Sequence, residues 1–289
     1  ALFDSNQINP DNLSIENKRF KARNFVKTLE FLGQDVVNIG SNDFKGGLDF
    51  LINITKNSEV NFISANLYDK SSNELIFEPY HILEKDGTKI AFIGLSEAAN
   101  SNSIINKNFI VEGNRYISEL KSSVDIIFLL VNVLDNNSID LSESFKNADY
   151  IFLSGSTKRT EPRSKQSDSG ALIYGGGIQG KHLSILDIRI KDLNKAINDV
   201  SAPFNRLQEI DYRLNKLQAK NTSIRLEELY ANQPNVLSLI KKYQKEATEL
   251  GISLASHQNR STFFSIPLSP SIPDDKDVAS FIQDIADKA

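Results

Sequence analysis

The chain of 289 residues contains no cysteine and no methionine, and it has only three histidines. Without cysteine, these residues form no disulfide, no thiolate metal site and no cysteine nucleophile. Methionine is missing even at position 1, which predicts that the chain begins after processing or trimming, as when a signal peptide is removed. A cysteine-free chain of this kind is compatible with export.

Long hydrophobic runs and an excess of positive charge are also missing. No apolar run approaches the roughly 20 residues that a membrane-spanning helix needs. The formal net charge is −4, whereas a nucleic-acid-binding surface usually carries a basic stripe. We therefore expect neither a transmembrane segment nor a nucleic-acid partner.

Strand-like runs rich in valine, isoleucine and phenylalanine alternate with helical patterns over the first two thirds of the chain. Most of these runs are continuously apolar, which is typical of strands that are buried on both faces. They lie at residues 35–40, 61–67, 89–95, 124–133, 148–155, 170–176 and 182–190. A hairpin turn is predicted at residues 85–88, which read KDGT. The pattern predicts an α/β domain with helices covering a largely buried sheet.

The last third of the chain has a different periodicity. After Val200, leucine and isoleucine recur at spacings of three and four, with Pro234 between two such segments. This pattern predicts two antiparallel helices that form a hairpin. Two ordinary amphipathic helices lying on the α/β core are the alternative interpretation.

Two terminal helices are also predicted, one near each end of the chain. The first covers residues 14–32, with Ser14 as its cap. The second follows a strand at residues 261–268 and has Asp274 as its cap. Its predicted buried face carries Val278, Phe281, Ile282 and Ile285.

Several of these segments, read in order, resemble a known family. The blocks are GSNDFKGGLDFL, FISANLYD, FEPYHILEKDGTKIAFIGLS, VDIIFLLVNV, ADYIFLSGSTKR and GALIYGGGIQGKHLSILDIRI. They are similar to the metallophosphoesterase domain of bacterial 5'-nucleotidases and UDP-sugar hydrolases, which belongs to the calcineurin-like superfamily. The resemblance implies a four-layer αββα sandwich whose first strands are upstream of Ala1 or missing.

The resemblance covers roughly residues 1–192 and suggests a division of the chain into three parts. Residues 1–200 are expected to form the metallophosphoesterase-like domain. Residues 201–256 are expected to form the helical hairpin, and residues 257–289 a C-terminal strand–helix segment. Residues 203–289 resemble the helical appendage of one exported subgroup, which implies a location in the periplasm or at an envelope membrane, with a lipid anchor upstream as one option.

The family hydrolyses phosphate esters with two divalent metal ions roughly 4 Å apart. Its metal-binding motifs align with positions that hold other residue types in this chain. The degenerate positions are Ser41, Asn42, Asp43, Asn132, Ser156 and Lys158. Replacing imidazole by hydroxyl or carboxamide removes a good metal donor, and Lys158 adds a cation. The resemblance therefore implies a degenerate site with no metal, no cofactor and no catalytic residue, although upstream aspartates could supply ligands.

Two further segments carry candidate binding residues. The loop at residues 156–170 contains four cations, which suit phosphate or carboxylate groups if the loop is more than a solvated connection. These are Lys158, Arg159, Arg163 and Lys165. In the hairpin, we expect Leu214, Leu217, Ile240 and Tyr243 to hold the helices together and Arg213 and Lys242 to face a protein partner.

Other chemical motifs are weaker. Residues 175–182, GGGIQGKH, nearly match a phosphate-binding loop. That motif must open a helix, whereas the following residues alternate like a strand and His182 replaces the magnesium-binding hydroxyl. The histidines lie outside the family's ligand loops and are expected to be structural. We therefore interpret the chain as an exported, catalytically inactive binding or scaffolding protein; a phosphoesterase that uses upstream and unusual ligands is the alternative.

Overall fold

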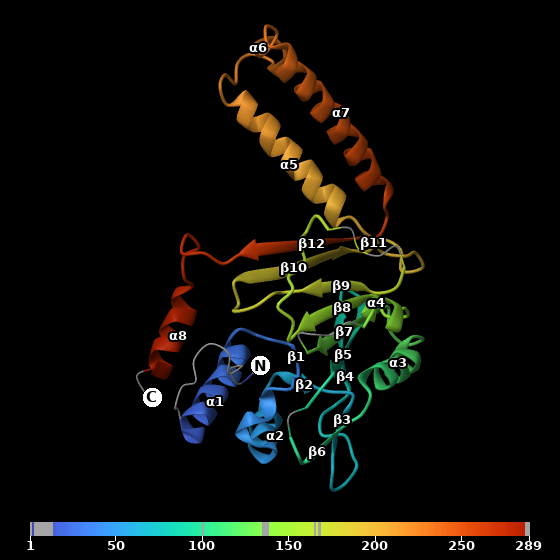
Figure 1. The fold of residues 1–289 in the computed structure, drawn as a ribbon, viewed down its shortest axis with the longest axis vertical. Coiled ribbons are helices and arrows are strands. Elements are labelled where there is room, and N and C mark those ends of the chain that lie inside the picture. The colour runs from blue at the N-terminus through green and yellow to red at the C-terminus, as the bar shows by residue number, and fades with distance from the viewer. Residues whose placement is uncertain are drawn as a thin grey trace. The chain divides into compact units, whose positions relative to one another are not determined.

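The computed structural model describes residues 2, 14–99, 101–134, 139–164, 166 and 169–286. The chain divides into two compact units (Figure 1). The first unit contains residues 1–159, 167–181 and 268–289, and the second contains residues 160–166 and 182–267. The predicted three-part division follows other boundaries and stays a prediction.

A five-stranded sheet forms the centre of the first unit. Its strands, in spatial order, are β4 (Tyr80–Lys85), β5 (Thr88–Ser96), β7 (Ile126–Asn132), β8 (Tyr150–Ser154) and β9 (Leu172–Gly175). The pairs from β5 to β9 are parallel, and β4 pairs with β5 in antiparallel orientation. The predicted turn between β4 and β5 is confirmed. Asp86 and Gly87 both have positive φ, 52° and 77°, as a two-residue type I′ turn requires.

Two small sheets accompany the main sheet. Strands β1 (Val36–Asn38) and β2 (Asn61–Ile63) are parallel, and β3 (Leu67–Asp69) pairs antiparallel with β6 (Ile104–Asn106). The single strand expected at residues 61–67 is therefore wrong. The buried Asn66 carboxamide accepts from Ser96 N at 2.9 Å and donates to Ser96 O at 2.7 Å. The Asn66 side chain thus makes hydrogen bonds to Ser96 that a backbone group would make in a continuous strand. The chain therefore ends its pairing in β2 before it begins the pairing of β3.

Helices cover these sheets and close two apolar cores. They are α1 (Ile15–Phe31), the 3₁₀ helix η1 (Asp43–Gly46), α2 (Leu48–Lys56), α3 (Phe109–Leu120) and α4 (Leu141–Ser144). One core contains Ile117 of α3 with Ile93 and Leu129 of the main sheet. The other contains Val26 of α1 and Leu51 of α2. The α/β fold class is thus confirmed, because apolar faces of helices and sheet are buried against each other.

The terminal helices agree with the sequence to different degrees. Ser14 Oγ accepts from Asn17 N at 3.2 Å, so the predicted cap of α1 is confirmed. The cap predicted for α8 (Lys276–Ala286) is wrong: Asp275 immediately precedes the helix and accepts from two of its amides. The expected buried face of α8 is also wrong. No described residue of this helix is buried, although Phe281 stacks on Phe31 of α1 with 4.4 Å between ring centroids.

The second unit combines a three-stranded sheet with a helical hairpin. In the sheet, β12 (Arg260–Pro267) lies between β10 (His182–Arg189) and β11 (Asn198–Asp199). Because His182 opens a strand, residues 175–182 lack the helix that a phosphate-binding loop requires.

Helices α5 (Ser201–Gln218), α6 (Leu226–Leu229) and α7 (Pro234–Ser256) form the hairpin. Pro234 is the first residue of α7 and lacks the N–H that the first turn would leave unpaired. Arg206 contacts Glu246 and Arg213 contacts Tyr243, so α5 and α7 run antiparallel. Among the described residues, no helix combines the length and hydrophobicity that crossing a bilayer requires.

Candidate functional site

Three predicted former metal positions lie where parallel strands end. Ser41 follows β1, Asn132 is the last residue of β7, and Ser156 follows β8. Ser41 N donates to Asn132 Oδ1 at 3.0 Å, and Asn132 Nδ2 donates to Ser154 Oγ at 3.0 Å. The Asn132 carboxamide therefore joins the loop after β1 to the end of β8. The carboxyl ends of parallel strands are where α/β enzymes generally place their ligands.

Glycines bring the same segments into close contact. A Cβ atom on Gly40 would lie 3.0 Å from Asn132 Cγ. Gly155 has φ +84°, and a Cβ atom there would lie 2.1 Å from Val133 O and 3.0 Å from Asn132 Nδ2. At Gly155 only a residue without a side chain fits, whereas a side chain at position 40 would press on the Asn132 carboxamide, so backbone lies close to Asn132 on two sides.

Asp43 is a carboxylate among the former metal positions, and its oxygens have protein partners. The residue is 2% exposed. Its Oδ1 accepts from Leu2 N, and its Oδ2 accepts from Gly40 N at 2.8 Å. The side chain thus satisfies buried backbone amides of its own loop and of the N-terminal segment.

The remaining positions do not form a donor set that suits a pair of divalent cations. Asn42 precedes η1 and makes no side-chain cap, and Ser156 Oγ accepts from Lys158 N at 3.2 Å. Among the described residues, no group of three or more histidine, aspartate and glutamate side chains is arranged to hold a metal. Hydroxyl, carboxamide and ammonium groups are poor substitutes for the imidazole and carboxylate ligands of such centres. The two metal ions implied by the resemblance do not fit these residues.

The four cations that the sequence places in one loop do not all belong to the same unit of the structure. Lys158 and Arg159 belong to the first unit, where Arg159 forms a β-bridge with Gly176. Arg163 belongs to the second unit, and its Nη1 lies 3.0 Å from Glu209 Oε2 of α5. Lys165 lies outside the described residues. The loop residue Arg163 is therefore brought to the hairpin.

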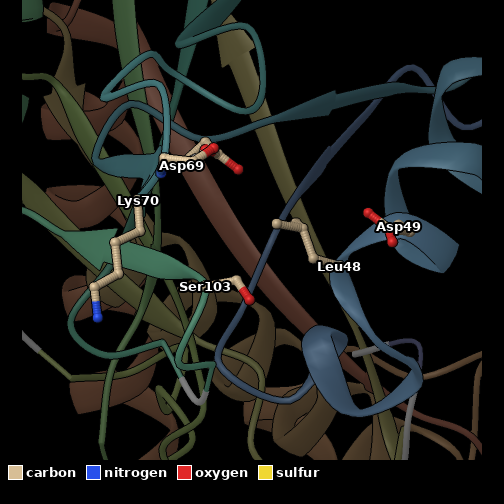
Figure 2. Close-up of a pocket in the computed structure, with 6 residues that line it drawn as sticks. Leu48, Asp49, Asp69, Lys70 and Ser103 are labelled. Carbon is tan, nitrogen blue, oxygen red and sulfur yellow. Dashed lines mark hydrogen bonds between the residues drawn. The ribbon is translucent and has the colours of Figure 1, made fainter.

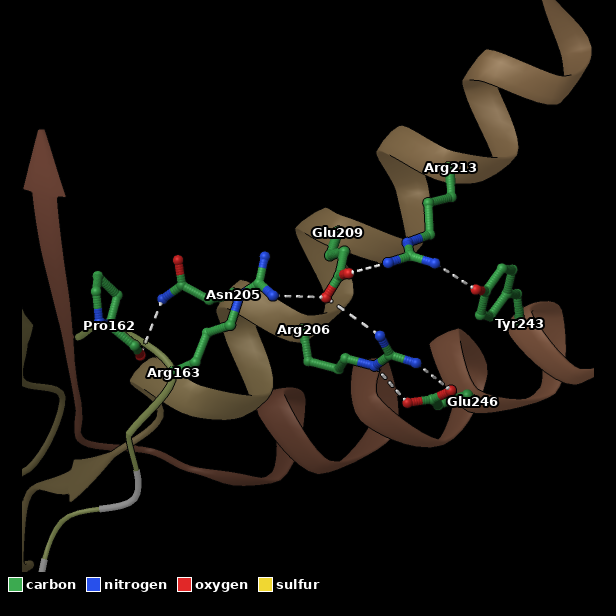
Figure 3. A network of polar contacts seen from close by, with 8 residues as sticks. All are labelled: Pro162, Arg163, Asn205, Arg206, Glu209, Arg213, Tyr243 and Glu246. Atoms are coloured by element: carbon green, nitrogen blue, oxygen red, sulfur yellow. Dashed lines mark hydrogen bonds and ion pairs between the residues drawn. The ribbon is translucent and has the colours of Figure 1, made fainter. Parts of the chain in front are cut away.

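Glu209 is the centre of a polar network in the second unit (Figure 3). Besides Arg163, it contacts Arg206 at 3.2 Å and Arg213 at 2.6 Å. Arg206 also bridges to Glu246 of α7 through two hydrogen bonds of 2.7 and 3.0 Å. Sequence reasoning missed Glu209, Arg206 and Glu246. The i, i+3 and i, i+4 spacing of Arg206, Glu209 and Arg213 was an available signal.

The arginines of the network stabilise the ionised form of its two carboxylates. The hydrogen bond from Arg213, followed by that from Arg206, lowers the pKa of Glu209 below its usual value. The hydrogen bond from Arg206 likewise lowers the pKa of Glu246. Each carboxylate is therefore charged near neutral pH, and its arginine contacts are charge-assisted.

The hairpin residues predicted from the sequence occupy different environments. Ile240 and Tyr243 are buried, and Ile240 is packed with Leu214 and Leu217. Arg213 Nη1 donates to Tyr243 OH at 2.9 Å, so this arginine also joins the two helices. Lys242 is exposed.

A cavity of about 440 Å³ lies elsewhere in the first unit (Figure 2). Its lining residues are Leu48, Asp49, Asp69, Lys70, Ser71 and Ser103. Asp69 accepts from the backbone and hydroxyl of Ser71, and the hydroxyl contact lowers the pKa of its carboxyl. None of the predicted site residues lines this cavity.

Sequence relatives are found among bacterial 5'-nucleotidases. The chain is 39% identical over 70 residues to a 5'-nucleotidase of Vibrio cholerae, and the aligned stretch covers 24% of this chain and 13% of that protein. It is 31% identical over 118 residues to a 5'-nucleotidase of Vibrio parahaemolyticus, covering 37% and 21%. The chain thus spans about a fifth or less of the length of these relatives. No family model matches the sequence.

Solved structures of the same fold cover most of the chain. The calcineurin-like phosphoesterase YfkN from Bacillus subtilis superimposes with a TM-score of 0.59 at 15% identity, covering 92% of this chain and 73% of that one. A putative 5'-nucleotidase from Staphylococcus aureus superimposes with a TM-score of 0.54 at 11% identity, covering 91% and 44%. The chain therefore shares the fold of these phosphoesterases, and part of it is similar in sequence to bacterial 5'-nucleotidases.

Proposed function

We propose that this protein is a catalytically inactive metallophosphoesterase-like protein that binds or scaffolds a protein partner. The observation that carries the proposal is the hydrogen-bonded bridge at the former metal site. Asn132 connects Ser41 N to Ser154 Oγ, and both contacts are 3.0 Å long. The loops that would share metal ions are instead linked by a neutral carboxamide.

The chemistry of the substituted positions supports the loss of activity. A metal-dependent hydrolase needs donors that hold the cation and leave room for an activated water molecule. Here Asp43 accepts from Leu2 N and Gly40 N, and Gly40 lies against Asn132. Lys158 brings a positive charge to a position where the family has a histidine, which disfavours a second cation.

An exported location is part of the proposal. The resemblance to exported 5'-nucleotidases and the absence of cysteine are compatible with the periplasm or the surface of an envelope membrane. The competing function, hydrolysis of phosphate esters with upstream and unusual metal ligands, is suggested by the similarity to 5'-nucleotidases.

Purified protein is expected to contain far less than one zinc or manganese ion per chain and to hydrolyse neither a generic phosphodiester nor a 5'-nucleotide. Elemental analysis and phosphate release measure the two properties. The double substitution Asn42→His and Ser156→His should leave both results unchanged, because Ser41, Asn132 and Lys158 still lack suitable donors. An active family member serves as the assay control. Two bound divalent ions with measurable turnover would establish the competing function.

Partner association is expected to depend on the hairpin. Replacing residues 203–254 by a short linker removes most of α5 and all but the last two residues of α7, while the first unit keeps its own apolar cores. We expect the variant to retain a folded first unit and to lose the proteins that co-purify with the full chain. Circular dichroism checks folding, and mass spectrometry identifies the recovered proteins. If the same proteins are recovered, the α/β face is the binding surface.

A further inference from the structure

The base of the hairpin carries an excess of positive charge. Arg163 of the loop and Arg206 and Arg213 of α5 surround Glu209. Lys242 of α7 precedes Glu246 by four residues, which places both side chains on the same face of the helix. Four cations thus face two carboxylates, in a chain whose net charge is −4. These four residues carry a local positive charge in a chain that is negatively charged as a whole. We call them the basic cluster: Arg163, Arg206, Arg213 and Lys242.

The two arginines at the outside of the cluster retain unused donors. The side chains of Arg163 and Arg213 are 65% and 51% exposed, whereas that of Glu209 is only 14% exposed. Each guanidinium has five N–H donors. Arg163 contacts Glu209 through Nη1, and Arg213 uses Nη2 for Glu209 and Nη1 for Tyr243. Figure 3 shows both side chains converging on the same carboxylate from different segments.

The arrangement of the cluster favours an anion with several charged groups. The guanidinium groups of Arg163, Arg206 and Arg213 converge on the Glu209 carboxylate, so the space between them already holds one anion. The donors that remain exposed belong to Arg163 and Arg213, which come from a loop and from α5. A peptide with several carboxylates can contact both, because successive acidic side chains reach successive cations.

We propose that the basic cluster is the docking site for an acidic segment of a protein partner. This inference rests on the proposed binding function and adds the chemistry of the partner. Glu209 acts as an internal competitor that orients Arg163 and Arg213 before the partner carboxylates arrive. Such contacts lie at the surface and therefore favour association at low salt, since screening weakens them as ionic strength rises.

Fluorescence anisotropy with the full chain and a labelled (Glu-Gly)₅ peptide tests the proposal at about 50 mM salt. The matched neutral probe is (Gln-Gly)₅. We expect binding of the acidic peptide alone. The double variant Arg163→Gln and Arg213→Gln should bind about tenfold more weakly, since it loses two charge-assisted contacts. The control variant Lys216→Gln and Lys241→Gln changes the charge equally on exposed hairpin residues outside the cluster and should bind like the original chain.

The variant Glu209→Gln separates recognition from a structural role. Removing the competing carboxylate should tighten binding of the acidic peptide severalfold, roughly as expected for one surface ion pair, whereas a purely structural network would make binding weaker. The proposal would be overturned if the acidic and the neutral peptide bound with equal affinity. It would also be overturned if the control variant weakened binding as much as the double arginine variant, or if Glu209→Gln weakened binding. Displacement of the peptide by equimolar inorganic phosphate would identify a simple anion site and also overturn it. Phosphoesterase activity, in contrast, would refute only the inactive state.

Discussion

Gly155→Ala is expected to lower the free energy of unfolding of the first unit by about 3–4 kcal/mol. Gly155 has φ +84°, and an added Cβ atom would lie 2.1 Å from Val133 O. The left-handed backbone and the collision with a carbonyl oxygen act together, because neither a rotamer change nor a side-chain shift can relieve the contact. The neighbouring Asn132 bridge would be displaced at the same time.

Gly180→Ala is the matched control for this substitution. Gly180 also has positive φ, +58°, but no atom lies within 4 Å of an added Cβ. Its cost should therefore be limited to the backbone conformation, about 1 kcal/mol. Thermal and urea unfolding of both variants give the two values. Equal destabilisation would mean that the approach between the loops after β7 and β8 is looser than the structure has it.

Ile240→Ala is expected to destabilise the hairpin by about 2–5 kcal/mol, the usual cost of a cavity at a fully buried aliphatic side chain. Ile240 is 0% exposed and is packed with Leu226, Tyr230 and residues of α5. Because the two helices share one narrow apolar core, loss of this side chain removes contacts on both of them. Hydrogen exchange of the amides in α5 and α7 should accelerate, and binding of the (Glu-Gly)₅ peptide should weaken.

Leu239→Ala provides the adjacent control. Leu239 is 42% exposed, so its truncation should change the free energy of unfolding by roughly 0.5 kcal/mol or less. Hydrogen exchange in the hairpin should then match that of the original chain. A similar loss of protection in both variants would show that the hairpin does not depend on the core around Ile240.

The sequence alone determined the features that depend on neighbouring residues. The apolar runs predicted the strands of an α/β fold, and KDGT predicted the turn between β4 and β5 because aspartate and glycine tolerate positive φ. Spacings of three and four, with Pro234 between them, predicted the antiparallel hairpin. The family motifs also indicated which loops should hold a site, since these loops follow the ends of parallel strands.

Predictions from local sequence patterns were wrong where a contact with a distant residue, or the lack of a neighbouring surface, decided the local structure. The run at residues 61–67 has strand composition throughout, yet Asn66 bonds to the backbone of Ser96 and divides it. The apolar face of α8 predicted burial, but amphipathic spacing does not specify whether a neighbouring surface exists. The helix start was misplaced by one residue, because adjacent aspartates at positions 274 and 275 are equally good caps.

Only the tertiary structure decided how distant polar residues combine. Asn132 was identified as a lost ligand, but its bonds to Ser41 N and Ser154 Oγ require three strand ends to lie side by side. Arg163 and Glu209 are 46 positions apart, and nothing in their local sequence pairs them. The periodicity of a sequence indicates which face of a helix or strand is apolar. The partner of a charged side chain depends instead on which residues lie near it in the folded structure. The sequence thus determined the strands and the hairpin and predicted the substituted ligand positions, and the packing of separate segments determined the carboxamide bridge and the basic cluster.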